Sequence, residues 1–353
     1  MSDLQIPVFG HDDRLAPMSA RLKAGVERAR GVLANESASC SVHTLRHDQG
    51  DVFHDLVEYV EDAAQRSVVD AFPMGRIILP SRTGKTVIAG KFIGESGLTA
   101  TFLVPTRTLL EQAVSDLRVA LPGAPVGYYY SDGKELVAHG INVITYQSLV
   151  GLWGEQNELP APLAESALVF ADEGHTTMSA LRMTALLKGF DPSAPRIAMT
   201  ATPDYSFERA LGRYFPELIH ELTLAEAMDL DLLASVRVWV YEVDADASKV
   251  RMVAGSYDNG EIGEIMSAAP FFKMAHVIRY HSDNIDRSAL VCCSSRQQAA
   301  DLLAYLTKFR PKDRPAPVVV DKDTERDERV RIKAAYESGE IDTIINVRAM
   351  ILG

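Results

Sequence analysis

The chain has 353 residues, of which 47% are hydrophobic and 24% charged, and its 36 Lys and Arg against 48 Asp and Glu give a net charge of −12 at pH 7. This length fits two domains of ordinary size, and the composition is that of a soluble globular protein. No stretch approaches the ~18 apolar residues of a membrane span, and the first residues lack the pattern of a secretory signal. We therefore expect a cytoplasmic protein with no membrane partner.

The acidic balance argues against a general attraction to nucleic acid, because phosphate backbones attract Lys and Arg. The charge is uneven, however: residues 273–353 hold 14 basic and 12 acidic residues, a net +2, which leaves −14 for residues 1–272. Net charge thus leaves a polyanionic partner open, and a local groove would have to supply the field. The three cysteines (Cys40, Cys292 and Cys293) make no disulfide framework and no metal-ligand spacing, and they fit core thiols in a reducing cytoplasm.

The sequence of the first half of the chain predicts helices that alternate with short apolar strands. Residues 1–44 predict a polar tail and one accessory helix at about 19–35, where apolar residues recur at helical spacing. From Leu45 the alternation indicates a parallel α/β sheet. Strands are expected at 76–80, 100–104, 125–130, 141–145, 167–171 and 196–199. Helices are expected at 52–71, 85–94, 107–119, 179–188 and 206–213.

Beyond Pro216 the pattern changes. Residues 221–233 predict a helix, residues 236–243 alternate like a strand, and the polar stretch 248–263 carries no chemistry that we can interpret. A second alternation follows, with strands at 288–293, 317–321 and 342–347 and helices at 296–308 and 325–337. We therefore expect two α/β domains, at 45–222 and 223–353, with a linker near 216–235.

The most informative motif begins on the strand that ends at Leu79 and continues into a tight turn and a helix. The turn and the first helical residues are Ser81, Arg82, Thr83, Gly84, Lys85 and Thr86. In such a turn, backbone N–H groups surround phosphate oxygens, the Lys ammonium binds the β- and γ-phosphates, and the Thr hydroxyl binds Mg²⁺. Leu79 and Arg82 stand where the pattern has Gly at its first place and often at its fourth. An ordinary strand–turn–helix remains the alternative.

Two adjacent acids end a buried strand further along the chain. Asp172 and Glu173 follow the continuous apolar run 167–171, as expected of a strand covered on both faces. Phosphoryl transfer to water needs one carboxylate for Mg²⁺ and a second group to orient or deprotonate the attacking water. The carboxyl end of a parallel strand is where open α/β sheets bind ligands. A solvated pair that merely caps the strand is the alternative.

Together, these residues resemble the superfamily 2 helicases and translocases, which are built from two tandem RecA-like domains and belong to the P-loop NTPases. The likeness runs from Leu45 to Gly353, with segments in the family's order at 45–49, 81–86, 104–109, 145–149, 172–175, 200–203, 290–296 and 346–353. Among these, residues 172–175 resemble the DEAH form of motif II. Within this superfamily, the chain most resembles the helicase subunits of restriction systems and their phage and bacterial relatives.

The resemblance implies roles for single residues. Lys85, Asp172, Glu173 and His175 would be catalytic: Lys85 would bind the β- and γ-phosphates of ATP, Asp172 and Thr86 would hold Mg²⁺, and Glu173 would activate water. Gln49 would recognise adenine and join residues 81–86 in the cofactor site. His175 would sense the nucleotide state through Thr200 and Thr202, which would couple hydrolysis to domain movement.

Six further residues would contact nucleic acid in this family: Thr106, Arg107, Thr145, Gln147, Ser294 and Arg296. Several of them, and Gln49, have a simpler explanation. Thr106 and Thr145 stand where a helix N-cap is expected, Ser294 and Arg296 open the next predicted helix, and Gln49 could cap or solvate the helix that follows it.

Two departures from the family bear on this interpretation. Gly174 stands where DEAH has Ala, and we expect the exchange to be nearly harmless because both residues are small. The sequence stops at Gly353 inside motif V, so we expect a truncated chain whose second RecA-like domain is incomplete and lacks the arginine finger, a group that contributes ~10³ to 10⁵ in rate.

The expected function is an ATP-dependent helicase or translocase on DNA or RNA, with DNA favoured. Its expected protein partners are other subunits of a restriction, repair or phage complex. One alternative is a double-strand translocase or remodelling motor that does not unwind. Another is a nucleotide-binding scaffold module with little turnover. A small-molecule kinase is a distant third, because residues 172–175 and 200–203 are not what such an enzyme needs.

Overall fold

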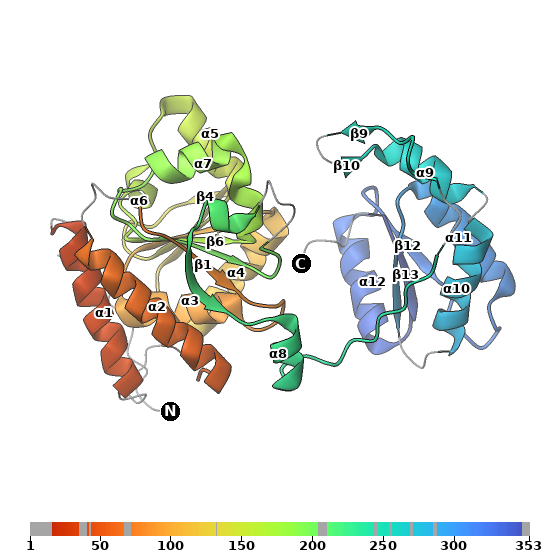
Figure 1. The fold of residues 1–353 in the computed structure, drawn as a ribbon, viewed down its shortest axis with the longest axis horizontal. Helices are drawn as coiled ribbons and strands as arrows, with labels where there is room; N and C mark the ends of the chain where they lie inside the picture. The colour runs from red at the N-terminus through yellow and green to blue at the C-terminus, as the bar shows by residue number, and fades with distance from the viewer. Residues whose placement is uncertain are drawn as a thin grey trace. The chain divides into compact units, whose positions relative to one another are not determined.

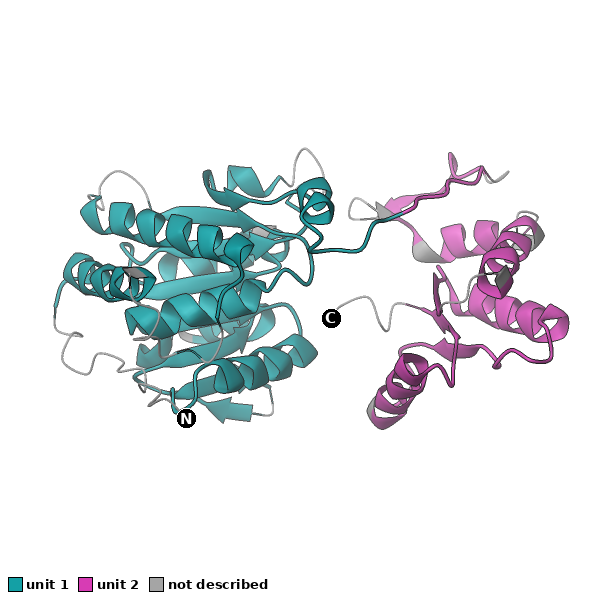
Figure 2. Ribbon diagram, turned by 90° about the horizontal axis from the view of Figure 1, so that it is seen from below, with its two compact units in different colours: residues 1–236 teal, residues 237–353 magenta. Residues whose placement is uncertain are grey.

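The computed structural model describes residues 16–34, 41, 44–66, 72–131, 133–203, 210–242, 246–253, 256–268, 271–284 and 288–347. The chain divides into two compact units, residues 1–236 and residues 237–353 (Figure 2). Across the described ranges, no helix combines the length and the apolar character that a membrane crossing requires.

The first unit is built on one large sheet, which confirms the predicted parallel α/β architecture. Its described strands are β1 (Met74–Ile78), β2 (Ala100–Val104), β3 (Val126–Tyr130), β4 (Gly133–Glu135), β5 (Ile141–Thr145), β6 (Leu168–Asp172), β7 (Arg196–Thr200) and β8 (Glu217–Glu221). Their order in the sheet is β4-β3-β5-β2-β6-β7-β1-β8. All neighbours run parallel except β4, which is antiparallel to β3. The carboxyl ends of β1 and β6 therefore lie at one edge, separated by β7 alone.

Helices cover both faces of this sheet (Figure 1). One face carries α1 (Met18–Ala34), α2 (His47–Gln65), α3 (Lys85–Ser96) and α4 (Arg107–Ala120), and the other carries α5 (Tyr146–Gln156), α6 (Ala161–Ala164) and α7 (Ala180–Lys188). Because side chains alternate across a strand, neighbours serve different cores. Phe102 packs with Phe170 on the α1–α4 side, with ring centroids 6.1 Å apart, whereas Leu103 packs on the α5–α7 side.

The second unit has a smaller parallel sheet. Its strands are β11 (Ala289–Cys292), β12 (Val318–Val320) and β13 (Thr343–Asn346), in the order β11-β13-β12. Helices α10 (Phe271–Asn284) and α11 (Arg296–Phe309) share one core with the sheet, and α12 (Arg326–Ser338) contributes to another. A short hairpin of β9 (Met252–Val253) and β10 (Ser256–Tyr257) precedes α9 (Asn259–Ser267).

Several elements differ from the sequence prediction. Helices α5 and α10 were not predicted, and the polar stretch 248–263, for which no elements were predicted, contains β9, β10 and most of α9. Part of the expected linker forms β8, which pairs with β1, and α8 (Leu224–Asp229) follows it. Residues 236–242 form no strand, and Val238 and Val240 are 75% and 91% exposed. In the expected helix at 206–213, residues 211–213 form a single 3₁₀ turn, and residues 206–209 lie outside the described ranges.

A buried arginine organises the turn between α7 and β7. Arg196 has no exposed surface, and its guanidinium donates hydrogen bonds to six backbone carbonyls, those of Leu186, Leu187, Phe190, Asp191, Pro192 and Ala194. Burial lowers its pKa to about 10, so the side chain is still charged at neutral pH. The guanidinium thus replaces water for carbonyls that the irregular turn leaves without helix or strand partners.

Candidate nucleotide site

The turn after β1 has the backbone geometry of a phosphate-binding loop. Arg82 and Gly84 have φ angles of 69° and 91°, in the left-handed region that favours glycine. A Cβ at Gly84 would lie 2.4 Å from Gln49 Nε2, so only glycine fits there. The left-handed angle at Arg82 explains why related loops often carry Gly at that place. The Thr83 hydroxyl closes the turn with a 2.7 Å hydrogen bond to the Pro80 carbonyl.

The polar groups predicted for this loop lie around the start of α3. Lys85 is its first residue, and its ammonium donates to the Leu79 carbonyl at 3.3 Å. Thr86 follows and is half-buried, whereas Ser81 and Arg82 are exposed at the turn. The loop therefore presents an ammonium, hydroxyls and a helix N-terminus close together, which is the donor set that binds phosphate oxygens.

Gln49 is tied to this loop. Its side chain is buried, its Oε1 accepts from the Arg46 backbone N–H at 3.1 Å, and its Nε2 donates to the Thr83 carbonyl at 2.9 Å. The Arg46 guanidinium donates to the same carbonyl at 3.1 Å. Gln49 thus joins the N-terminus of α2 to the loop, and adenine recognition by this residue stays a prediction.

The two acids lie at the end of β6, on the same edge of the sheet and one strand away from β1. Asp172 is the last strand residue, and its Oδ1 is buried without a hydrogen-bond partner among the described residues. Burial, and then the negative charge of Glu173, raise the pKa of Asp172 to about 6, while the positive charge of Lys85 lowers it. The ammonium and the carboxylate are therefore close enough to interact. A buried carboxylate oxygen with no donor is well suited to a divalent cation.

Glu173 belongs to a polar network with the residues predicted to couple hydrolysis to movement. The Thr200 hydroxyl donates to Glu173 Oε2 at 3.3 Å and lies 2.9 Å from His175 Nδ1. Thr202 Oγ1 lies 3.3 Å from the same nitrogen. The structure thus brings these four predicted residues together at the ends of β6 and β7.

Sequence reasoning missed Tyr146. This residue opens α5 and is buried, and its hydroxyl donates to the Asp172 carbonyl at 2.7 Å. Burial raises its pKa well above the usual value, so the phenol stays protonated and remains a donor. Tyr146 thereby fixes the backbone at the acid pair. Nothing in the local sequence indicates this role, because the contact spans 26 residues.

Glycine and alanine are not interchangeable at position 174 of this chain, although both residues are small. A Cβ at this position would lie 2.6 Å from the Ala198 Cβ on β7, closer than real Cβ atoms approach. The space is taken by a rigid backbone-attached methyl group rather than by the end of a flexible side chain. Gly174 therefore allows the segment after the acid pair to pack against β7.

We expect Gly174→Ala to lower the free energy of unfolding by about 1–3 kcal/mol, the usual effect of overpacking. Adding Ala198→Gly removes the opposing methyl group, so the double variant should recover part of the loss, with a coupling energy above about 1 kcal/mol. Gly151→Ala is the control, because a Cβ there has nothing within 4 Å. Urea unfolding of the four variants checks this, and additive effects of the two substitutions would contradict it.

Burial of Asp172 predicts a stability gain when its charge is removed. Between the usual pKa of 3.8 and about 6 only the folded state holds the proton, so the contribution of this group to stability falls as pH rises through that window. At about 1.4 kcal/mol per pKa unit, Asp172→Asn should raise the free energy of unfolding at pH 7 by about 2–3 kcal/mol. The gain should shrink towards pH 4. Urea unfolding with a chelator present measures it, and an equal gain at both pH values would refute the argument.

The residues of the first unit that were predicted to contact nucleic acid line a groove of about 550 Å³ at the same sheet edge. Thr106 and Arg107 lie at the start of α4, and Thr145 and Gln147 at the start of α5. The Thr106 hydroxyl accepts from the Leu109 N–H at 3.3 Å and the Thr145 hydroxyl from the Ser148 N–H at 3.1 Å, so both also cap their helices. The groove thus contains two helix N-termini, which attract anions.

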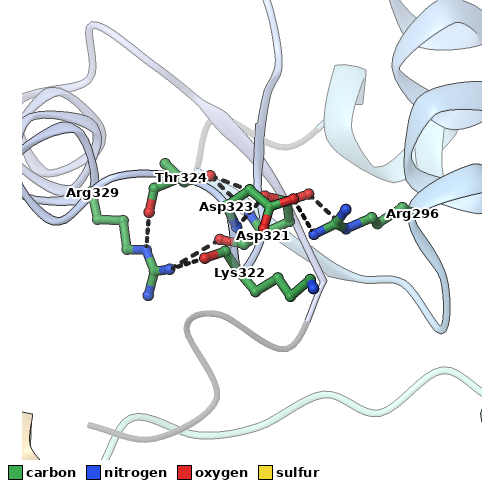
Figure 3. Close-up of polar contacts among 6 residues, drawn as sticks. All are labelled: Arg296, Asp321, Lys322, Asp323, Thr324 and Arg329. Carbon is green, nitrogen blue, oxygen red and sulfur yellow. Dashed lines mark hydrogen bonds and ion pairs between the residues drawn. The ribbon is translucent and has the colours of Figure 1, made fainter.

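In the second unit the predicted residues have partners within their own unit. Ser294 donates to Gln298 Oε1 through its N–H at 2.8 Å and its hydroxyl at 2.9 Å. Arg296 forms ion pairs with Asp321, at 3.0 Å, and with Asp323 (Figure 3).

The loop that holds Arg296 is itself fixed. The Arg329 guanidinium donates to the carbonyls of Asp321, Lys322 and Thr324, as Figure 3 shows. The predicted nucleic-acid contact of Arg296 would therefore have to compete with two carboxylates that the loop holds in place.

Comparison with known proteins agrees with this geometry. Residues 43–205, which include the loop, both acids and Thr200, match the family described as "Type III restriction enzyme, res subunit". The chain is also 25% identical over 198 residues to the Type I restriction enzyme EcoAI endonuclease subunit of Escherichia coli. That match covers 55% of this chain and 23% of the relative, so the chain spans about a quarter of the relative's length.

Solved structures also resemble the chain. Dbp5 of S. cerevisiae bound to RNA and ADP BeF3 is 13% identical, with 98% of this chain and 78% of that chain covered and a TM-score of 0.49. The Hef helicase domain of Pyrococcus furiosus is 13% identical, with 84% and 85% covered and a TM-score of 0.49.

Proposed function

We propose that this chain binds ATP and Mg²⁺ at the carboxyl ends of β1 and β6 and hydrolyses ATP to move along nucleic acid. The observation that carries the proposal is the convergence of Lys85 with the acid pair. β1 and β6 flank β7 on either side, and the charge of Lys85 acts on the Asp172 carboxylate. An ordinary strand–turn–helix would not need an ammonium near a carboxylate that has a buried oxygen without a partner among the described residues.

In this site Lys85 and the N–H groups of residues 81–86 hold the triphosphate, and Thr86 and Asp172 hold Mg²⁺. When bound, the metal neutralises charge on the phosphates. Glu173 orients a water molecule and accepts its proton. His175, hydrogen-bonded to Thr200 and Thr202, transmits the state of the site to the loop after β7.

DNA is the polymer that we propose, because both sequence matches are named for restriction enzymes. It would contact Thr106, Arg107, Thr145 and Gln147 in the groove of the first unit, and Ser294 and Arg296 of the second unit would add contacts. In the cell we expect a cytoplasmic protein that works with other subunits of a restriction, repair or phage complex.

Steady-state ATP turnover with and without DNA tests the proposal. We expect single- or double-stranded DNA to stimulate turnover, because strand binding and hydrolysis are coupled in a translocating ATPase. Equal turnover with and without DNA and RNA would refute nucleic-acid coupling. Tight ATP binding with negligible hydrolysis would instead favour a nucleotide-binding scaffold. Strand-displacement and triplex-displacement assays then separate unwinding from movement along a duplex.

A further inference from the structure

A short hairpin at the edge of the first sheet forms part of the groove wall. Strands β3 and β4 pair with Tyr129 opposite Lys134 and Tyr130 opposite Gly133. A Cβ at Gly133 would lie 2.8 Å from the Tyr128 ring and 2.9 Å from the Tyr130 ring, so both rings pack closely over this glycine. Tyr129, Tyr130, Ser131 and Lys134 all line the groove, although none of them belongs to a motif found in the sequence.

The hairpin places one cation directly in the groove. The Lys134 ammonium lies 5.3 Å from the centroid of the Tyr129 ring, within the range of a cation–π contact. In the part of the chain that the structure describes, no carboxylate forms an ion pair with Lys134. Its charge is therefore available to a ligand in the groove.

The hairpin also positions a second cation. The Arg107 guanidinium lies 4.7 Å from the centroid of the Tyr130 ring, and its Nε is 3.0 Å from Glu111 Oε1. Tyr130 stacks on Tyr128 with centroids 5.9 Å apart, so its ring is held from the other direction as well. This arrangement restricts Arg107 to a position at the groove.

The chemistry of the groove favours phosphates over bases. Among the described residues, two cations line it against one carboxylate, that of Glu155, within a unit whose sequence is strongly acidic. The Lys134 ammonium lies over the Tyr129 ring and the Arg107 guanidinium over the Tyr130 ring. A base would have to displace one of these cations in order to stack on either ring. Phosphate contacts of this kind position a strand without reading its sequence.

We propose that Lys134 is a phosphate contact for a nucleic-acid strand and that Tyr130 is a positioning residue for Arg107, so that the β3–β4 hairpin extends the groove beyond the family motifs. The inference rests on the proposed function, because it deepens the nucleic-acid site named there. The hairpin then contributes one additional phosphate contact, and its contribution is independent of base sequence.

Salt dependence of strand binding tests the role of Lys134. The probe is a fluorescein-labelled oligothymidylate of about 20 nucleotides, longer than the ~4–16 nucleotides of common single-strand sites. We expect Lys134→Gln to weaken binding about three- to tenfold and to reduce the slope of log K against log salt by about 0.7, the value for one lost phosphate contact on a single strand. Lys188→Gln, an exposed lysine at the end of α7, removes the same charge outside the groove lining and should leave the slope unchanged.

Two substitutions of Tyr130 test its positioning role. Tyr130→Leu removes the ring beneath Arg107 and should lower the salt slope as Arg107→Gln does, whereas Tyr130→Phe keeps the ring and should restore it. A merely structural role for the ring would change stability without changing the slope. An unchanged salt slope in Tyr130→Leu would therefore overturn the positioning role of Tyr130.

The outcomes separate the two proposals. If the unsubstituted chain binds neither oligothymidylate nor an oligouridylate, the proposed function and the inference both fail. If it binds and Arg107→Gln reduces the slope while Lys134→Gln behaves like Lys188→Gln, the inference alone is overturned. If neither substitution changes binding, the strand binds elsewhere and the groove is not the site.

Discussion

Replacing Glu173 with glutamine is expected to reduce ATP turnover by a factor of about 10² to 10⁴, the usual contribution of a positioned general base. The amide keeps the size of the side chain and still accepts the hydrogen bond from the Thr200 hydroxyl. It cannot accept a proton from water. Because Glu173 is not in the set that holds the phosphates, nucleotide affinity should change little.

Lys85→Ala provides the comparison, since it should weaken nucleotide binding as well as turnover. Equilibrium binding of a fluorescent ATP analogue and phosphate release, measured on the same samples, separate the two effects. Turnover of Glu173→Gln within threefold of the unsubstituted chain would remove Glu173 from the mechanism. Loss of binding in Glu173→Gln equal to that in Lys85→Ala would show that its effect lies in the site's structure.

We expect the largest loss of stability from a substitution at Arg196. Arg196→Met leaves six carbonyls without their donor in a buried turn, and an unsatisfied buried polar group costs about 1–3 kcal/mol. Some of these carbonyls will find water or rearrange, so we expect a loss of at least about 3 kcal/mol in the free energy of unfolding, measured in urea.

Arg76→Met is the matched control for this substitution. Arg76 lies on the adjacent strand β1, is half-buried and donates to two carbonyls, those of Phe215 and Pro216. We expect its replacement to cost about 1 kcal/mol, as for hydrogen bonds near the surface. Arg196→Lys should be intermediate, because it keeps the charge and loses the planar fork. Equal losses for both Arg→Met variants would contradict the role given to the buried guanidinium.

The limits of β2, β5, β6 and β7 could be predicted from sequence to within about a residue, whereas β1 was expected two residues later in the chain than it lies. β2 and β5 each begin after a polar or Gly-containing stretch and run as five mostly apolar residues, so their limits at 100–104 and 141–145 were predicted correctly. Helix α5 was missed because it begins at Tyr146, directly after β5, and contains Gly151 and Gly154, which weaken the helical signal. β4 was missed because its three residues contain no apolar side chain.

Some residues of the candidate site could likewise be predicted from the sequence, and others could not. Lys85 and the acid pair could be found because each follows an apolar strand at a position that parallel sheets place at one edge. Tyr146 could not, because its contact with Asp172 spans 26 residues, and Lys134 could not, because the sequence of β4 contains no apolar side chain and the strand was missed. The close contact at Gly174 could not be predicted for the same reason: residue size alone does not reveal the Ala198 methyl group on a neighbouring strand.

The φ angle of 49° at Glu173 has a consequence for protein engineering. An L-residue with a side chain in this conformation costs about 1–2 kcal/mol, which glycine would relieve. Directed evolution for heat resistance alone will therefore enrich glycine at position 173, and by the argument for Asp172 it will enrich asparagine next to it. A library that varies positions 172 and 173 therefore needs a screen for ATP turnover, because the most heat-resistant variants would otherwise have lost activity.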